Sequence, residues 1–185
     1  MNKQATSLAP VKLGKPTGVG MGVAFMWALG GQMLTGIVLV LLFGANGFST
    51  QHAQRGMAVI LVLGDLVALG LCVAIGEGLR SGRKWAWWIV VVLTSALALG
   101  GVLILPRTAM ALGNHDGWAL WPQIILLTLA PFIAYRLLQP TTRTWYDGVT
   151  LATARARHNA PAWFATIIAS AAVGGALTAI FERLG

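Results

Sequence analysis

The sequence has little charge, and acidic residues are the scarcest charged kind. Only 10% of its 185 residues are charged, and five Asp or Glu stand against 13 Lys or Arg. A soluble domain carries about 25% charged residues and uses polar side chains to cover its core. Here 57% of the residues are hydrophobic and the mean hydropathy is +0.74. The composition therefore excludes an ordinary soluble domain and indicates a multi-pass membrane protein.

Cysteine and histidine are too scarce for the commoner redox and metal centres. The single cysteine, Cys72, excludes an internal disulfide and any site built from several thiolates. The three histidines, His52, His115 and His158, fall between the apolar stretches, where they cannot be axial ligands of a membrane haem. The sequence also has no P-loop, nucleophile elbow or zinc-spaced His pair. We expect no catalytic residue, no metal, no cofactor and no enzymatic activity.

Five apolar stretches are long enough to cross a bilayer as helices. About 20 apolar residues span about 30 Å of hydrocarbon. The fold class expected is therefore all-α, a polytopic helical membrane protein with a tail at 1–20, one transmembrane domain at 21–181 and a loop at 139–160 within it. The last stretch is the least apolar, so four spans are the alternative to five. The five stretches are 21–43, 57–79, 85–105, 118–138 and 162–181.

The basic residues predict the orientation of these spans. With the N-terminus inside, ten of the 13 Lys and Arg residues fall in the inside segments, and only Arg55, Arg107 and Arg183 fall outside. Cytoplasmic loops carry such an excess of Lys and Arg. We predict a cytoplasmic N-terminus in the cell membrane, which is the inner membrane for a bacterial protein. Because the cations mark topology, we expect no nucleic-acid partner.

Tryptophans gather at the expected span ends. An indole is half polar, and it favours the headgroup region of a bilayer. The sequence therefore predicts five interfacial anchors, three after the basic turn at 80–84 and two at the outer end of the fourth span. The anchors are Trp85, Trp87, Trp88, Trp118 and Trp121.

Local features predict three details at the ends of the spans and in the connectors between them. Glu77 precedes Arg80 by three residues, so an ion pair is expected there. Gly82 supplies the conformational freedom of the tight basic turn. In the loop at 139–160, Asp147 is placed to cap a short helix over 150–158.

Small residues recur at four-residue spacing in two of the spans. Helices in lipid gain little from hydrophobicity against one another, so small residues mark the faces on which they pack. Small residues surround most of the fifth span, which favours contacts on several sides and hence an assembly. The packing candidates are Gly64, Ala68, Cys72 and Gly76 in the second span and Ser170 and Gly174 in the fifth.

Asp65 is the one ionisable residue deep in an expected span. A charge at such depth costs about 2.5–3.5 kcal/mol on insertion scales. Polar candidates at similar depth are Gln32 and Thr35 in the first span and Ser95 in the third. Two interpretations stay open: a proton or cation site, and a hydrogen bond that locks helices together.

Two motifs frame the middle of the chain. "GLRSGRKWAWW" at 78–88 forms a Gly-Leu-x-x-Gly-Arg-x-Trp-Ala turn, and "LLQPTTRTWY" at 137–146 forms a Leu-x-x-Pro-x-x-Arg-x-Trp end. Over about 76–146 the chain resembles a loose class of small bacterial multi-pass membrane proteins of unknown function. The resemblance implies helical membrane spans, commonly four, and transfers no functional residue.

These features favour a non-catalytic accessory or scaffolding subunit that joins a larger membrane complex through helix contacts. The alternative is a small oligomeric transporter or channel, coupled to an ion or proton through Asp65. A more distant alternative is an enzyme acting on lipid headgroups through His115 and Asp116. The partners expected are membrane lipids and either other membrane subunits or further copies of this chain.

Overall fold

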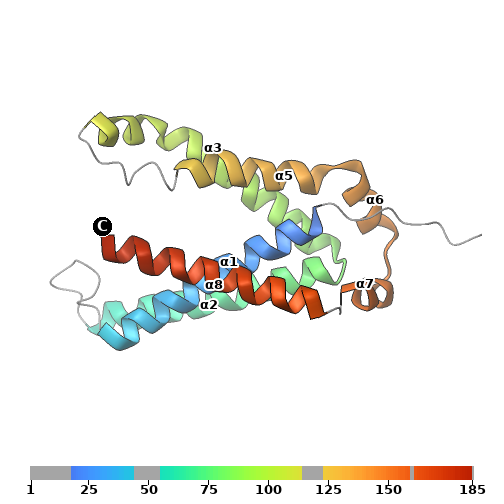
Figure 1. The fold of residues 1–185 in the computed structure, drawn as a ribbon, viewed down its shortest axis with the longest axis horizontal. Coiled ribbons are helices and arrows are strands. Elements are labelled where there is room, and N and C mark those ends of the chain that lie inside the picture. Colours follow the sequence, from blue (N-terminus) through green and yellow to red (C-terminus); the bar gives the residue numbers. More distant parts are fainter. Residues whose placement is uncertain (1–17, 44–54, 114–122, 159–160, 185) are drawn as a thin grey trace, which may run out of the picture.

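The computed structural model describes residues 18–43, 55–113, 123–158 and 161–184, and within them every element is helical (Figure 1). Three helices are long and apolar enough to cross a membrane. They are α1 (Val19–Phe43), α2 (Arg55–Arg80) and α3 (Lys84–Gly113). Two shorter apolar helical stretches cover Ile125–Leu138 and Ala162–Leu177. The all-helical expectation is confirmed for these ranges.

The second half of the chain holds five further elements. A π-helical turn, η3, leads into α5, and two short helices, α6 and α7, precede the long α8. The connector predicted at 139–160 therefore contains two short helices over 140–158: α7 agrees with the short helix predicted over 150–158, and α6 was not predicted. The bounds are η3 (Ile125–Leu129), α5 (Ala130–Leu138), α6 (Pro140–Gly148), α7 (Leu151–His158) and α8 (Pro161–Leu184).

The cap of α7 differs from the expected one. The Thr150 hydroxyl accepts the backbone N–H of Thr153 at 3.3 Å, because Thr150 directly precedes the first residue of this helix. Asp147 lies too early in the chain, within α6. The prediction that Asp147 caps the helix was therefore wrong.

The third helix is longer than expected. The predicted span ended at residue 105, but α3 continues through Pro106 to Gly113 and has 30 residues. Pro106 has no backbone N–H to donate to the carbonyl four residues before it. Two polar side chains bond other carbonyls of the same stretch. The Thr108 hydroxyl donates to the Ile104 carbonyl at 3.3 Å, and the Gln123 side-chain amide donates to the Gly101 carbonyl.

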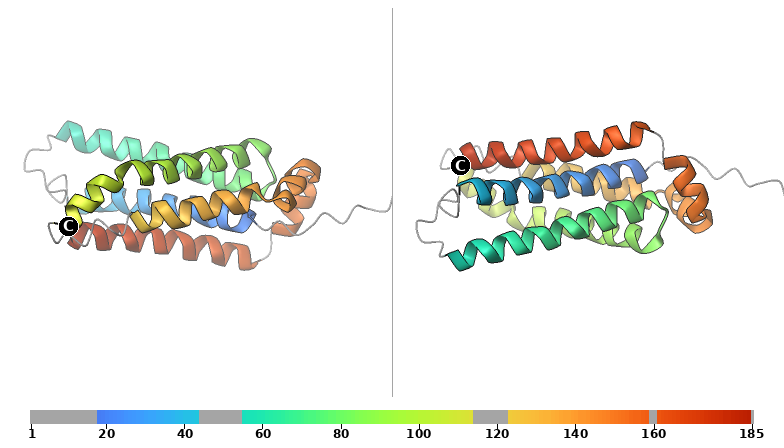
Figure 2. Two further views of the ribbon diagram at one scale, coloured as in Figure 1. Left: turned by 90° about the horizontal axis from the view of Figure 1, so that it is seen from above. Right: turned by 90° about the horizontal axis from the view of Figure 1, so that it is seen from below.

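The helices form two groups that meet at one end and separate toward the other (Figure 1). One group has α1 between α2 and α8, and the other has α3 against η3 and α5. In the first group α1 and α8 run in the same direction, and α2 runs in the opposite one (Figure 2). Helices α6 and α7 lie across the end where the groups meet.

Buried side chains concentrate at the end where the groups meet. Val19, Leu79 and Leu137, from three different helices, are completely buried there. Toward the opposite end Leu42 and Leu103 are more than two thirds exposed. The bundle therefore has one closely packed end and one open end.

Helices α1 and α8 approach each other with backbone against backbone. A Cβ placed on Gly31 would overlap the carbonyl of Ala171, and one placed on Gly174 would overlap the carbonyl of Ala28. Only glycine permits this separation, and close backbone contact is a main source of helix association in lipid. The predicted packing role of Gly174 thus corresponds to an intramolecular seam with α1.

We predict that Gly174→Ala destabilises the isolated chain by about 1–3 kcal/mol, because the methyl group meets backbone that cannot yield. Gly100→Ala is the matched control, since a Cβ at Gly100 meets nothing within 4 Å. The control should be neutral or slightly stabilising, because alanine favours a helix more than glycine does. Reversible unfolding in detergent measures both variants, and equal stabilities would contradict the seam.

Candidate functional site at the basic end of the bundle

The basic connectors come together at the closely packed end. The turn between α2 and α3, with the helix residues on either side of it, carries three cations; the end of α5 and α6 each carry one, and α7 carries two. The alternating helix directions require this, since α2 and α5 end where α1, α3 and α8 begin. The seven cations are Arg80, Arg83, Lys84, Arg136, Arg143, Arg155 and Arg157.

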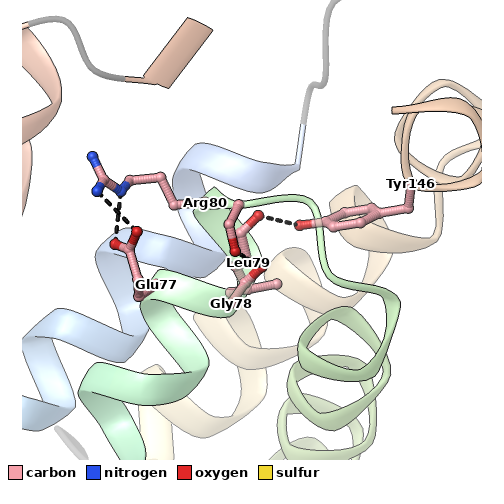
Figure 3. Close-up of polar contacts among 6 residues, drawn as sticks. Glu77, Gly78, Leu79, Arg80 and Tyr146 are labelled. Carbon is pink, nitrogen blue, oxygen red and sulfur yellow. Dashed lines mark hydrogen bonds and ion pairs between the residues drawn. The ribbon is translucent and has the colours of Figure 1, made fainter. Parts of the chain in front are cut away.

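The two motifs of the sequence pack against each other here. The hydroxyl of Tyr146 in α6 donates to the Leu79 carbonyl at 3.1 Å, which joins α6 to the end of α2 (Figure 3). The indole N–H of Trp87 in α3 donates to the Leu137 carbonyl at 3.0 Å, which joins α3 to the end of α5. The rings of Trp87 and Tyr146 stack with centroids 5.8 Å apart.

A third side chain ties the start of α1 to this cluster. The Thr142 hydroxyl is buried, accepts the backbone N–H of Gly18 at 3.1 Å and donates to the Arg136 carbonyl at 3.1 Å. The carbonyls of Leu79, Arg136 and Leu137 all lie in the last turns of their helices. Such carbonyls lack partners within their own helix, and of the three the Leu79 carbonyl also accepts the backbone N–H of Gly82 in the turn at 3.1 Å. Three side chains from separate segments therefore complete the ends of α2 and α5.

The basic turn uses glycine as predicted. Gly82 has φ +75°, a left-handed conformation that side chains other than glycine's rarely adopt. A Cβ at Gly82 would also lie 2.6 Å from Cγ1 of Val149, so the connector after α6 closes directly over the turn. Turn and connector thus form one packed unit.

Two ion pairs flank the turn. Arg80 pairs with Glu77 at 2.8 Å, as predicted, and its guanidinium lies 5.3 Å from the ring centroid of Phe164 in α8. Lys84 pairs with Asp147 at 2.8 Å, and both side chains are exposed. The hydrogen bond from Lys84 lowers the pKa of the Asp147 carboxyl.

The predicted tryptophan anchors divide into three sets. Trp85 and Trp88 are 44% and 53% exposed, which suits side chains that face headgroups. Trp87 is only 4% exposed and packs in the core, so it differs from these two, and its role as an interfacial anchor stays a prediction. Trp118 and Trp121 lie outside the described residues, as do His115 and Asp116.

Asp65 lies midway along α2, away from this cluster. A Cβ on Gly36 of α1 would come 3.0 Å from its Oδ2, so the carboxylate lies against α1 at this glycine. The Thr35 hydroxyl instead donates to the Gly31 carbonyl at 2.9 Å, next to Gly175 of α8. Gln32 and Ser95, both half-buried, make no hydrogen bond to Asp65 in the part of the chain that the structure describes.

The small-residue stripe of α2 is packed at one end only. Gly76 is buried against Trp27 of α1, and Cys72 lies near Gly30, but Gly64 is exposed with nothing within 4 Å of its Cβ position. Ala68 is half-buried between them. The stripe therefore turns away from α1 toward Gly64. Ser170, the packing candidate in α8, donates its hydroxyl to the Thr166 carbonyl of its own helix at 2.7 Å.

Comparison with known protein families, curated proteins and solved structures found no match to this chain. The resemblance to small multi-pass proteins therefore rests on the two motifs alone. Within the described ranges, no group of three His, Cys, Asp or Glu side chains has the arrangement of a metal site. Tyr146 and Thr142, which organise the basic end, were not singled out by sequence, because a hydroxyl near a helix end has no distinctive spacing.

We predict that Tyr146→Phe destabilises the chain by about 0.5–1.5 kcal/mol, because the variant removes one of two donors to the Leu79 carbonyl, which keeps the backbone N–H of Gly82. Burial also raises the pKa of the Tyr146 hydroxyl, so it remains a protonated donor throughout the neutral range. Tyr135→Phe is the control, since Tyr135 is 63% exposed. Equal unfolding midpoints for the two variants would show that the hydroxyl of Tyr146 contributes nothing.

A pH effect is expected from the pair of Lys84 and Asp147. The folded-state pKa of Asp147 is lowered from 3.8, so its contribution to stability is present above about pH 4 and is lost as pH falls through the lowered value. Asp147→Asn and Lys84→Met should both flatten this part of the stability–pH profile. An unchanged profile in either variant would contradict the contribution of the pair.

Proposed function

We propose that the protein is a multi-pass protein of the cell membrane that acts without catalysis, as an accessory or scaffolding subunit of a larger membrane assembly. The observation that carries the proposal is the carboxyl of Asp65, which has no hydrogen-bond donor in the described part of the chain although it lies midway along an apolar helix.

An unpaired carboxyl within hydrocarbon is costly, by about 2.5–3.5 kcal/mol on insertion scales. A polar group on a neighbouring helix offsets part of this cost, and interhelical hydrogen bonds in membranes contribute up to about 1–2 kcal/mol. Within the described ranges neither Gln32 nor Ser95 provides that bond to Asp65. A helix of another subunit is the partner that we propose.

The surface beside Asp65 suits such a helix. Gly64 is open, and the large side chains of Leu63, Leu66 and Val67 are 49–64% exposed around it. Exposed apolar side chains alone would only indicate lipid contact. The adjacent open glycine adds a place where a second backbone can approach closely, as α8 approaches α1 at Gly31.

The proposed topology has five spans, with the basic end in the cytoplasm. Support comes from α8, which runs beside α1 in the same direction and has 24 residues, about 36 Å at 1.5 Å per residue. Because α1 and α8 share the glycine seam, α8 would cross wherever α1 crosses. The grouping of seven cations at one end suits the cytoplasmic face.

A transporter or channel is the second candidate, and the same unpaired carboxyl favours it. The two grooves described in the bundle are lined by residues of α1, η3, α5 and α8 and do not include Asp65. Any path past Asp65 would then form between copies of the chain, so this candidate is an oligomer.

The test compares Asp65→Leu, Gly64→Leu and Gly100→Leu by purification of the tagged chain from native membranes in mild detergent. We expect the first two to retain about five- to thirtyfold less partner, equivalent to about 1–2 kcal/mol, and Gly100→Leu to retain the wild-type amount. Asp65→Leu should also leave the isolated chain as stable as wild type or more so, because it removes an unpaired carboxyl.

Other outcomes separate the candidates. If the wild-type chain purifies as a monomer with no partner, the subunit proposal fails. Cation or proton flux in proteoliposomes that disappears in Asp65→Asn would favour the transporter, whereas absence of flux in wild type would remove it.

A further inference from the structure

The bundle has an apolar groove on the side away from α2. It has a volume of about 380 Å³ and runs between α8 on one wall and η3 and α5 on the other, with α1 as its floor. Met21 and Phe25 form part of the floor, Leu129 and Ile133 one wall, and Ala169 and Val173 the other. The groove is open to the surroundings of the bundle.

The side chain of Arg136, one helical turn from this groove, has a hydrogen-bond donor without a partner among the described residues. Arg136 follows Ile133 by three residues on α5, so both share a helix face about 4.5 Å apart along the axis. Its Nε is buried and has no hydrogen-bond partner in the described part of the chain. A long side chain on a helix leans toward the preceding turn, which here is the turn of Ile133.

The start of α1 adds positive potential at the same place. Gly18 packs directly on the backbone of Arg136 and Leu137, and α1 begins at the next residue. The amino end of a helix favours anions. Met21, which lines the groove, is three residues further along α1, so the apolar lining and the positive end are consecutive turns of two adjacent helices.

We propose that this groove holds one acyl chain of an anionic phospholipid whose phosphate binds Arg136 beside the start of α1. The charge fits because the nearby basic end is cationic, and an arginine with a buried donor suits a phosphate oxygen. The apolar lining fits a hydrocarbon chain. The inference rests on the membrane location proposed above but not on assembly through Asp65.

The test measures phospholipid retained after purification from vesicles that contain phosphatidylglycerol and phosphatidylcholine, by native mass spectrometry. Arg136→Gln should retain about tenfold less phosphatidylglycerol, equivalent to about 1.4 kcal/mol, with phosphatidylcholine unchanged. Arg143→Gln removes an exposed charge at the same end and should behave as wild type. Ala169→Trp should exclude both lipids, and Ala172→Trp, on an exposed face of α8, should exclude neither.

Three results would overturn the proposal: equal loss in Arg136→Gln and Arg143→Gln, binding of inorganic phosphate without competition by the phospholipid, or altered oligomeric state in Ala169→Trp with lipid retained. Ala24→Leu, on the groove floor, replaces Ala169→Trp if that variant does not fold. Asp65→Leu should leave lipid retention unchanged, so this test and the test of assembly can fail separately.

Discussion

The ends of α2 and α5 leave backbone carbonyls that their own helices cannot satisfy, and the structure depends on how the basic end resolves this. Leu79 and Leu137 receive bonds from Tyr146 and Trp87, whose side chains come from α6 and α3. The Leu79 carbonyl also accepts the backbone N–H of Gly82 at 3.1 Å, and a buried carbonyl left without any donor would cost free energy. The bonds therefore determine where α6 crosses the bundle and how closely the turn after α2 approaches it.

This dependence explains why one end of the bundle is closely packed and the other is open. At the basic end, polar side chains join the two helix groups and bury a core that includes Trp145 at 1% exposed. Away from it, the glycine seam holds α1 and α8 at backbone contact, and Gly101 of α3 lies close to Leu126 of η3. Because lipid supplies no hydrophobic drive for helices to associate, helices without such contacts have little reason to converge. The separation of α3 from α2 follows.

The sequence predicted well those features that arise from composition and short spacing. The apolar runs predicted helices near the observed positions. Local chemistry predicted the ion pair of Glu77 with Arg80 and the glycine turn at Gly82. The features that the sequence did not predict come from tertiary contacts. Trp87 is 4% exposed and its indole N–H bonds to the Leu137 carbonyl, a contact with α5 that no local pattern around Trp87 indicates.

Other differences from the predictions have similar causes. The third span was predicted to end at residue 105, directly before Pro106, yet α3 continues to Gly113, and the Gln123 side chain bonds the Gly101 carbonyl within it. Asp147 was a reasonable cap for a helix, but Lys84 offers it a charged partner and Thr150 lies at the correct position to cap. The groove beside Arg136 needs three helices from distant parts of the chain, so no local pattern could reveal it.

Asp65 and Arg136 are two charged residues with hydrogen-bonding groups that lack a partner among the described residues, and the indole N–H of Trp27 is a third, neutral group of this kind. Asp65 is on α2 within the group of α1, α2 and α8, and Arg136 is at the end of α5 beside the start of α1. Opposite charges within one bundle would stabilise each other if they were close, and the fold instead keeps them apart, one midway along the helices and one at the basic end. We therefore propose a separate external partner for each: a neutral or cationic donor for Asp65 and an anion for Arg136. That difference is why we assign the two faces to different occupants, a helix and a phospholipid.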